Sequence, residues 1–323
     1  MATVGARRSA ASLPVALALF GTLLLNVTPA VGGVGGAATP VWPPSATVGE
    51  LFTASVTITN FSTTPNDTEA VTLTGASVTP ACAAPSISVC SGMNVDPDIF
   101  KVLSAVGDAS TAPCAGVVFQ VGTPDMTTGE VALTPLTTVT LGASIGALNT
   151  RTCQINITLR VFQVPTNPAQ PGPPVTTDPA ARVSLKGVNS MVTGTASGTA
   201  QIQVEKATPV LESTSNPNTG NVAPGTGVRD SASVIKAPGA IAPTGFVRFI
   251  LCQPSEVTSA GCPGGAGTKV GADRPLVNKS ALSAKSIDTL DLGTYCWRAR
   301  YLGDNNYNPQ NHTDATTECF TVE

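Results

Sequence analysis

The sequence predicts an all-β protein made of two tandem sandwich modules behind an N-terminal export signal. Gly (31) and Pro (27) are frequent among the 323 residues, and both residue types punctuate turns. After the signal, no window sustains the 3.6-residue apolar period of an amphipathic helix, whereas several alternate like strands. Charged residues make up only 11% of the chain and its net charge is −3. This balance provides no field that would attract nucleic acid or an anionic membrane.

The first 30 residues have the pattern of a cleaved signal peptide. The basic pair Arg7 and Arg8 precedes an apolar run over 13–25, which has the length of a signal-peptide core and is short for a membrane span. Small residues follow, and we expect cleavage after Ala30. An uncleaved anchor is the alternative, but polar residues and a proline at 26–29 end the apolar run. We therefore expect a secreted or cell-surface chain with no membrane span after signal removal.

A first sandwich module is predicted over 41–205, after a flexible Gly/Ala-rich segment over 31–40. Residues 51–59 and 153–164 alternate apolar and polar side chains, which is the period of a strand with one wet face. Further short strands are expected at 70–75, 117–121, 129–134, 137–141, 182–186 and 199–204. The Pro-rich stretch 165–179 is typical of a linker or of a long loop. We favour a loop, because the strand-like run at 199–204 closes the module.

A second sandwich module is predicted over 206–323. Turn residues separate its candidate strands at the intervals that are typical of β-sandwiches. These strands are expected at 208–212, 228–236, 245–252, 281–288, 293–301 and 317–323.

The eight cysteines indicate an oxidised, extracellular protein. A long cysteine-free gap divides them into two sets of four, at 82, 90, 114 and 153 and at 252, 262, 296 and 319. A structural metal site is disfavoured, because the chain has no C-x-x-C motif and a single histidine. In the first set we expect Cys82–Cys90, on closeness in sequence, and Cys114–Cys153 as the remainder. In the second set we expect Cys252–Cys262.

Three segments of the second module carry a family resemblance. Asp291–Cys296 resembles the D-x-G-x-Y-x-C signature of immunoglobulin strand F, except that Cys296 follows Tyr295 directly. Residues 301–307 (YLGDNNY) and 243–249 (PTGFVRF) resemble the Y-x-G-D-x-N-Y and P-x-G-x-V-x-F segments of bacterial immunoglobulin-like repeat domains. The resemblance covers 206–323 and implies an immunoglobulin-like sandwich of a secreted or surface protein, with no catalytic residues to carry over. The first module is similar, over 48–50 (VGE), to bacterial surface sandwich domains.

The position of Cys296 changes the disulfide that this resemblance would imply. Side chains alternate along a strand, so a shift of one residue moves the cysteine to the opposite face of the sheet. Tyr295 and Trp297 then point into the core, and Cys296 points outward. In the last strand Cys319 also points outward. We therefore expect a Cys296–Cys319 bridge on the outer side of one sheet, partly exposed to solvent.

One loop is crowded with oxygen-bearing side chains that could bind calcium, namely Asp304, Asn305, Asn306 and Asp314. The competing interpretation is a turn-rich hairpin, because Asn and Asp satisfy turn backbones themselves. The spacing is not that of an EF-hand loop, and we favour the turn.

Catalytic patterns are weaker still. His312 could serve a Ser–His–Asp site, but it lies in an expected exposed loop and no G-x-S-x-G is present. The carboxylate pairs Asp96/Asp98 and Asp288/Asp291 lie beside turns. The glycine-rich run 261–269 lacks the following helix of a phosphate-binding loop.

The sequence therefore favours a non-catalytic secreted or surface protein, with modules that act as a spacer or as an adhesive scaffold. We expect no cofactor and no nucleic acid partner, and an unidentified extracellular protein or polysaccharide as the partner. The alternative is a carbohydrate-binding module, whose sugar platform would need exposed aromatic rings. Aromatic residues are only 4% of the chain, and Trp42 is the one tryptophan outside a strand pattern. A secreted hydrolase would need a polar cluster that the sequence does not reveal.

Overall fold

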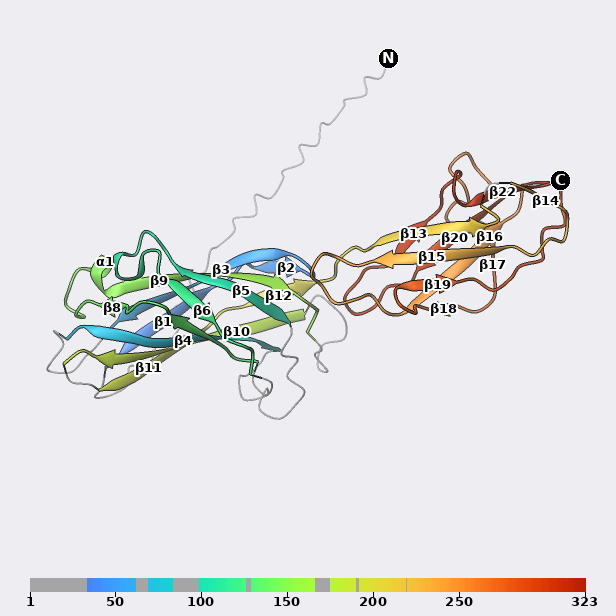
Figure 1. Cartoon of the computed structure of the whole chain (residues 1–323). Coiled ribbons are helices and arrows are strands. Elements are labelled where there is room, and N and C mark those ends of the chain that lie inside the picture. Colours follow the sequence, from blue (N-terminus) through green and yellow to red (C-terminus); the bar gives the residue numbers. More distant parts are fainter. Residues whose placement is uncertain are drawn as a thin grey trace, which may run out of the picture.

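The computed structural model describes residues 34–61, 69–83, 99–125, 129–165, 175–189, 192–218 and 220–323. It is nearly all β, with 53% strand and 3% helix. The strands form two bodies that lie end to end (Figure 1). The N-terminal body contains β1 to β12 and the C-terminal body contains β13 to β22. Among the described residues, none of the helices is both long and apolar enough to cross a membrane.

The N-terminal body is one strongly curved antiparallel sheet with a parallel pair at its edge. Its strands follow the order β1-β3-β9-β5-β6-β7-β4-β10-β12-β2, with β11 on β10 and β8 on β4. The elements are β1 (Gly36–Val41), β2 (Ser45–Thr47), β3 (Leu51–Asn60), β4 (Val71–Ala83), β5 (Phe100–Gly107), a 3₁₀ turn (Ala112–Cys114), β6 (Val118–Val121), β7 (Val131–Pro135), β8 (Thr140–Leu141), α1 (Leu148–Arg151), β9 (Thr152–Val161), β10 (Val175–Gly187), β11 (Thr193–Thr199) and β12 (Ile202–Glu205).

The alternation that the sequence shows over 51–59 and 153–164 sets the core of this body. Strands β3 and β9 pair so that Val56 lies opposite Ile155. Every second residue of β9 is almost completely buried, namely Ile155, Ile157, Leu159 and Val161. Their neighbours along the strand point to the wetter side, as expected of a strand with one buried face.

Two expectations for the N-terminal body were wrong. Residues 36–40, expected to be flexible, belong to β1, which pairs antiparallel with β3 from Gly36 opposite Asn60 to Val41 opposite Ser55. Small side chains do not prevent a strand when a partner strand supplies the hydrogen bonds. The Pro-rich stretch also ends in a strand, since β10 begins at Val175.

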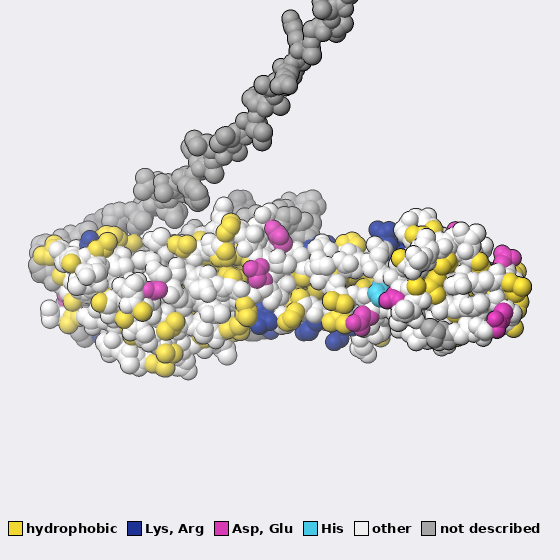
Figure 2. Space-filling view, turned by 90° about the horizontal axis from the view of Figure 1, so that it is seen from above, with side chains coloured by type: hydrophobic (Ala, Val, Ile, Leu, Met, Phe, Trp, Pro, Cys, Tyr) yellow, Lys and Arg dark blue, Asp and Glu magenta, His cyan; other side chains and the backbone are white. Residues whose placement is uncertain are grey.

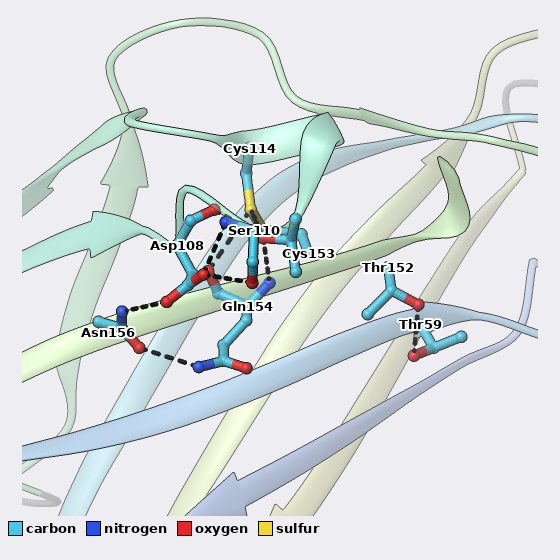
Figure 3. Close-up of a disulfide and its surroundings, with 9 residues drawn as sticks. Thr59, Asp108, Ser110, Cys114, Thr152, Cys153, Gln154 and Asn156 are labelled. Carbon is cyan, nitrogen blue, oxygen red and sulfur yellow. Dashed lines mark hydrogen bonds between the residues drawn. A yellow bond between two sulfur atoms is a disulfide. The ribbon is translucent and has the colours of Figure 1, made fainter. Parts of the chain in front are cut away.

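A disulfide fastens the 3₁₀ turn to β9 (Figure 3). Cys114 and Cys153 are bonded, with their Cα atoms 5.5 Å apart. Beside the bridge, the Asp108 carboxylate accepts hydrogen bonds from the Ser110 backbone N–H at 2.8 Å and from the Asn156 side chain at 2.7 Å. These hydrogen bonds lower the pKa of Asp108, with those from Ser110 as the main cause.

The C-terminal body is a sandwich of two sheets. One sheet has the order β13-β15-β19, and the other has the order β14-β22-β20-β16-β17, with β18 on β16 and β21 on β20. The strands are β13 (Val210–Asn216), β14 (Asn221–Val222), β15 (Arg229–Ile235), β16 (Phe246–Cys252), β17 (Thr268–Lys269), β18 (Arg274–Pro275), β19 (Ser280–Leu282), β20 (Gly293–Tyr301), β21 (Gln310–His312) and β22 (Cys319–Val322).

Strand β20 has the alternation that the sequence predicts. Tyr295, Trp297 and Tyr301 are fully buried between the sheets. Tyr295 stacks on Phe320 at a centroid distance of 5.7 Å, and its hydroxyl accepts the backbone N–H of Asp291 at 3.1 Å.

The outer face of β20 carries the second set of cysteines. Cys252 lies opposite Cys296, which lies opposite Cys319, on three adjacent strands. The structure contains the bridges Cys252–Cys262 and Cys296–Cys319. The expected partial exposure was wrong, because Cys296 is fully buried and Cys319 is 8% exposed. Val257 and Ala266, from the segment that Cys262 holds, pack against the sulfurs and cover them. The expected Cys82–Cys90 bridge lies outside the residues whose side chains are described.

Two glycines close the N-terminal body. A Cβ at Gly194 would lie 1.7 Å from the carbonyl oxygen of Val34, and one at Gly198 would lie 2.2 Å from that of Ala38. β11 can therefore approach β1 backbone to backbone only because these two positions have no side chain.

We predict that Gly194→Val destabilises the protein by about 1–3 kcal/mol or more, because the side chain forces β11 away from β1. Urea unfolding measures the change. Gly75→Ala is the matched control, because a Cβ at Gly75 meets no atom within 4 Å. Equal stability of the two variants would contradict the close packing of β1 on β11.

Candidate functional site

A cluster of four polar side chains lies between the two sheets of the C-terminal body. Ser213 comes from β13, Asp230 from β15, His312 from β21, and Glu318 precedes β22. The Ser213 hydroxyl donates to Glu318 Oε1 at 2.6 Å, and its oxygen lies 3.0 Å from His312 Nδ1. His312 Nδ1 lies 3.4 Å from the same carboxylate oxygen. The cluster thus brings together residues of three strands and of the segment that precedes β22.

Only the histidine reaches solvent. The His312 side chain is 25% exposed, whereas Asp230 and Glu318 are fully buried. Figure 2 shows the histidine at the surface of the C-terminal body, next to an acidic side chain.

The two buried carboxyl groups hold protons more tightly than exposed ones would. Burial raises the pKa of Asp230 to about 9, and the nearby charge of Glu318 adds to this effect. Burial also raises the pKa of Glu318, to about 7. The backbone N–H groups of Ser231 and Thr214 lower the pKa of Asp230, but burial outweighs their effect. An ionised pair would place two negative charges side by side in the core, where only the His312 ring could supply an opposing charge, so burial favours a protonated carboxyl group at this site.

The arrangement is suited to holding a proton and not to nucleophilic attack. The Ser213 hydroxyl lies within hydrogen-bond distance of both Glu318 Oε1 and His312 Nδ1, so the carboxyl group competes with the histidine for its proton. Ser213 is also only 5% exposed, which leaves little access for a substrate.

The expectation that His312 lies in an exposed loop was wrong. His312 is the last residue of β21 and pairs with Ala299 of β20. The cluster itself was not predicted from the sequence. A signal was present, because Asp230 is in phase with the buried residues Ala232 and Val234 along β15. A carboxylate on the buried side of a strand points to an unusual polar site.

The residues considered for calcium are engaged by backbone groups instead. Asp304 Oδ1 accepts the N–H groups of Asn306 and Tyr307 at 2.7 and 2.8 Å, which is the pattern of an Asx turn. Asn306 Oδ1 accepts the Val164 N–H of the N-terminal body at 2.7 Å. Asp314 forms a separate turn with Thr316. No group of three or more metal-ligating side chains is found among the described residues.

Trp42 is not a surface platform for sugars. It is 9% exposed and packs at 5.6 Å from Phe52 and at 5.3 Å from Phe100, measured between ring centroids. The sequence pattern missed this because the tryptophan precedes two prolines and not an alternating run.

The other segments considered for catalysis are also structural or exposed. Asp288 and Asp291 are exposed in a turn, and Asp96 and Asp98 lie outside the described residues. The glycine-rich run 261–269 continues into the short strand β17 and not into a helix.

Comparisons with known proteins place no family name on the chain. No family model and no curated protein matches it. Among solved structures, a cohesin module of a family 33 glycoside hydrolase from Clostridium perfringens is 9% identical, with a TM-score of 0.31 over 55% of this chain and 100% of that one. AggA, the major subunit of aggregative adherence fimbriae type I from Escherichia coli, is 11% identical, with a TM-score of 0.21 over 53% and 94%. AvmM, which catalyses macrocyclization in alchivemycin A biosynthesis, is 12% identical, with a TM-score of 0.32 over 53% and 89%. These similarities are too distant to assign a function.

We predict that the protein loses stability as the pH rises from about 5 to about 9. Both pKa values are raised above those of the unfolded chain, so the folded state holds more protons in this range. The contribution of the pair to stability is therefore fully present below the pKa values of the unfolded chain, roughly 4. It is lost as the pH rises toward the pKa values of the folded state. Asp230→Asn, a neutral isostere, should flatten the dependence and stabilise the protein at about pH 9 by on the order of 2 kcal/mol.

Urea unfolding of both proteins across this range measures the effect. Asp291→Asn, which removes an exposed carboxylate of the same body, is the control and should leave the slope unchanged. Parallel pH profiles for the wild type and Asp230→Asn would contradict the role of the buried pair.

Proposed function

We propose that this chain is a non-catalytic, exported spacer or adhesive scaffold, in which two β-sandwich modules form a stiff rod. The observation that carries the proposal is the junction between the bodies. β12 ends at Glu205 and β13 begins at Val210, which leaves only a few residues between them. Ala207, in this link, is 3% exposed. A buried link this short leaves little length for a flexible hinge.

Loops of the C-terminal body pack directly on the N-terminal body. The Phe162 carbonyl accepts the Ile241 N–H at 3.0 Å, and Arg160 donates to the Pro238 carbonyl at 2.8 Å. Gly49, at φ +91°, brings its turn so close that a Cβ there would lie 2.7 Å from the Ala237 side chain. Backbone approaches of this kind fix the relative positions of two bodies more firmly than surface side-chain contacts do.

The turn over 304–308 locks the link from the other side. Ala207 donates to the Asn306 carbonyl at 2.9 Å and accepts the Asn308 N–H at 2.8 Å. The Asn306 side chain reaches Val164, as described above, so one residue holds both the link and the N-terminal body. The Asn-rich segment that could have bound calcium is better explained as the clamp of this junction.

The same structure supports an extracellular location. Three disulfides join described residues, and disulfides of this kind form and persist in oxidising compartments. Together with the signal-like N-terminus, they support export with a mature chain that begins near Val31. A stiff rod is suited to holding a binding surface away from a cell.

We predict that small-angle X-ray scattering of the wild-type protein gives the narrow distribution of interatomic distances of one extended, rigid shape. Insertion of a Gly-Gly-Ser-Gly segment between Glu205 and Lys206 should broaden this distribution, because it separates the link from the clamp at Asn306. The same insertion between Gly264 and Gly265, in an exposed loop, is the control and should leave the shape unchanged. A broad distribution for the wild type would overturn the rigid-rod proposal.

A further inference from the structure

One outer face of the C-terminal body gathers cations that lie far apart in the sequence. In β16 and β20, Val247 lies opposite Tyr301 and Phe249 lies opposite Ala299, and all four are buried. The alternate residues therefore point away from the core, and these include Arg248 opposite Arg300 and Ile250 opposite Arg298. Lys269 of β17 lies opposite Ile250 and continues the row. We call this surface the basic face, which comprises Phe246, Arg248, Lys269, Arg298, Arg300 and Asn311.

The basic face holds more positive charge than its own carboxylate can balance. Asp273 pairs with both Arg248, at 3.0 Å, and Lys269, at 2.9 Å. Arg300 is exposed and has no ion pair or hydrogen bond among the described residues. It also stands directly across from Arg248, and like charges at such cross-strand positions repel.

Arg298 is partly buried and lies close enough to Arg300 for the two charges to affect each other. Its Nη2 donates to the Ala266 carbonyl at 3.0 Å, but its Nε is buried and has no partner among the described residues. Burial, followed by the charge of Arg300, lowers the pKa of its guanidinium. An anionic group placed between these guanidinium groups would relieve the repulsion that the bare surface carries.

The neighbours of the cations indicate what kind of anion fits. Phe246 is 49% exposed and lies two residues before Arg248, on the same side of β16. Asn311 of β21 is exposed and lies opposite Arg300. An exposed ring can stack on a sugar face, an amide can bond hydroxyl groups, and guanidinium groups pair with carboxylate or sulfate.

We propose that the basic face binds an acidic polysaccharide, with Arg300, Arg248 and Arg298 on its anionic groups and Phe246 against a sugar ring. Nucleic acid fits less well, because this face offers one exposed ring and not a series on which bases could stack. An anionic membrane fits less well because the strands present a single large apolar side chain at the edge of the face.

Binding of the whole chain to heparin and to dextran sulfate, with unsulfated dextran as the neutral comparison, tests the proposal. At physiological ionic strength, roughly 0.15 M, Arg300→Glu should weaken binding by about tenfold or more, because it reverses an unpaired charge in the centre of the face. Phe246→Ala should also weaken binding, which simple ion exchange would not produce. Arg229→Glu is the matched control: it reverses an exposed charge on the other sheet of the same body and should change the affinity by less than about twofold.

Three results would overturn the proposal: no binding of the wild type to either sulfated polymer, equal weakening by Arg229→Glu, or tighter binding to single-stranded DNA or to phosphatidylglycerol vesicles than to the polysaccharides. Melting temperatures check that each variant is folded. Arg300→Gln provides a milder second variant, which should weaken binding less than Arg300→Glu. The proposal does not depend on the stiffness of the rod, since these variants lie away from the Glu205–Lys206 link and should leave the scattering profile unchanged.

Discussion

The alternation of side chains along β20 governs both faces of the C-terminal body. With Tyr295, Trp297 and Tyr301 committed to the core, the residues between them must lie on the outside of the same sheet. Cys296 therefore cannot bridge the two sheets and instead joins the neighbouring strand, while Arg298 and Arg300 project from the same side. A shift of one residue would expose three large aromatic rings and bury two guanidinium groups, so this register is strongly specified. The sulfur cluster, the basic face and the aromatic core are consequences of one strand.

The junction depends on a second constraint, which is the close approach of two turns to the opposite body. Gly49 and Gly239 have φ values of +91° and +70°, and a Cβ would lie 2.7 Å from the Ala237 side chain at Gly49 and 2.4 Å from the flexible Arg160 side chain at Gly239. The turn that Asp304 organises then presents Asn306 to both the link and the N-terminal body. The residues that join the bodies are therefore turn residues, whose conformations are stabilised by hydrogen bonds within the turn itself.

Much of this architecture could be predicted from local pattern, and the rest could not for identifiable reasons. Period-two alternation predicted β3, β9 and β20, because burial of one face requires an apolar side chain at every second residue. β1 was missed because Gly36, Ala37 and Ala38 show no alternation of apolar and polar side chains, and this strand is defined by its pairing with β3. The burial of Cys296 was missed because the cover comes from a loop of the same body, which alternation within a strand cannot reveal.

The sites escaped prediction because each is assembled across strands. The polar cluster takes one residue from each of four segments, and the basic face takes its cations from positions 248, 269, 298 and 300. Neither forms a run, so no charge cluster or motif is visible along the chain. For Asp230 the phase of β15 did carry information, since it placed a carboxylate among inward-facing residues. The rule that charged side chains lie outside was the wrong guide there, because a protonated pair is not charged.

The buried pair and the disulfides act in opposite directions on the stability of the C-terminal body. Residues that are ionised at high pH and have no cation beside them oppose folding, and Asp230 and Glu318 do so from the centre of the sandwich. The Cys296–Cys319 bridge closes a loop with a sequence separation of 23, which the chain-entropy model values at about 3 kcal/mol. That is comparable to the cost of ionising Glu318, whose pKa is raised from 4.5 to about 7, at about 1.4 kcal/mol per unit, whereas the larger shift of Asp230 corresponds to a larger cost. The outer bridge ties the strand that Glu318 precedes to β20, so the covalent support acts next to the site that opposes folding. A body braced in this way can keep a proton-holding cluster in its core and still present a rigid outer face for binding.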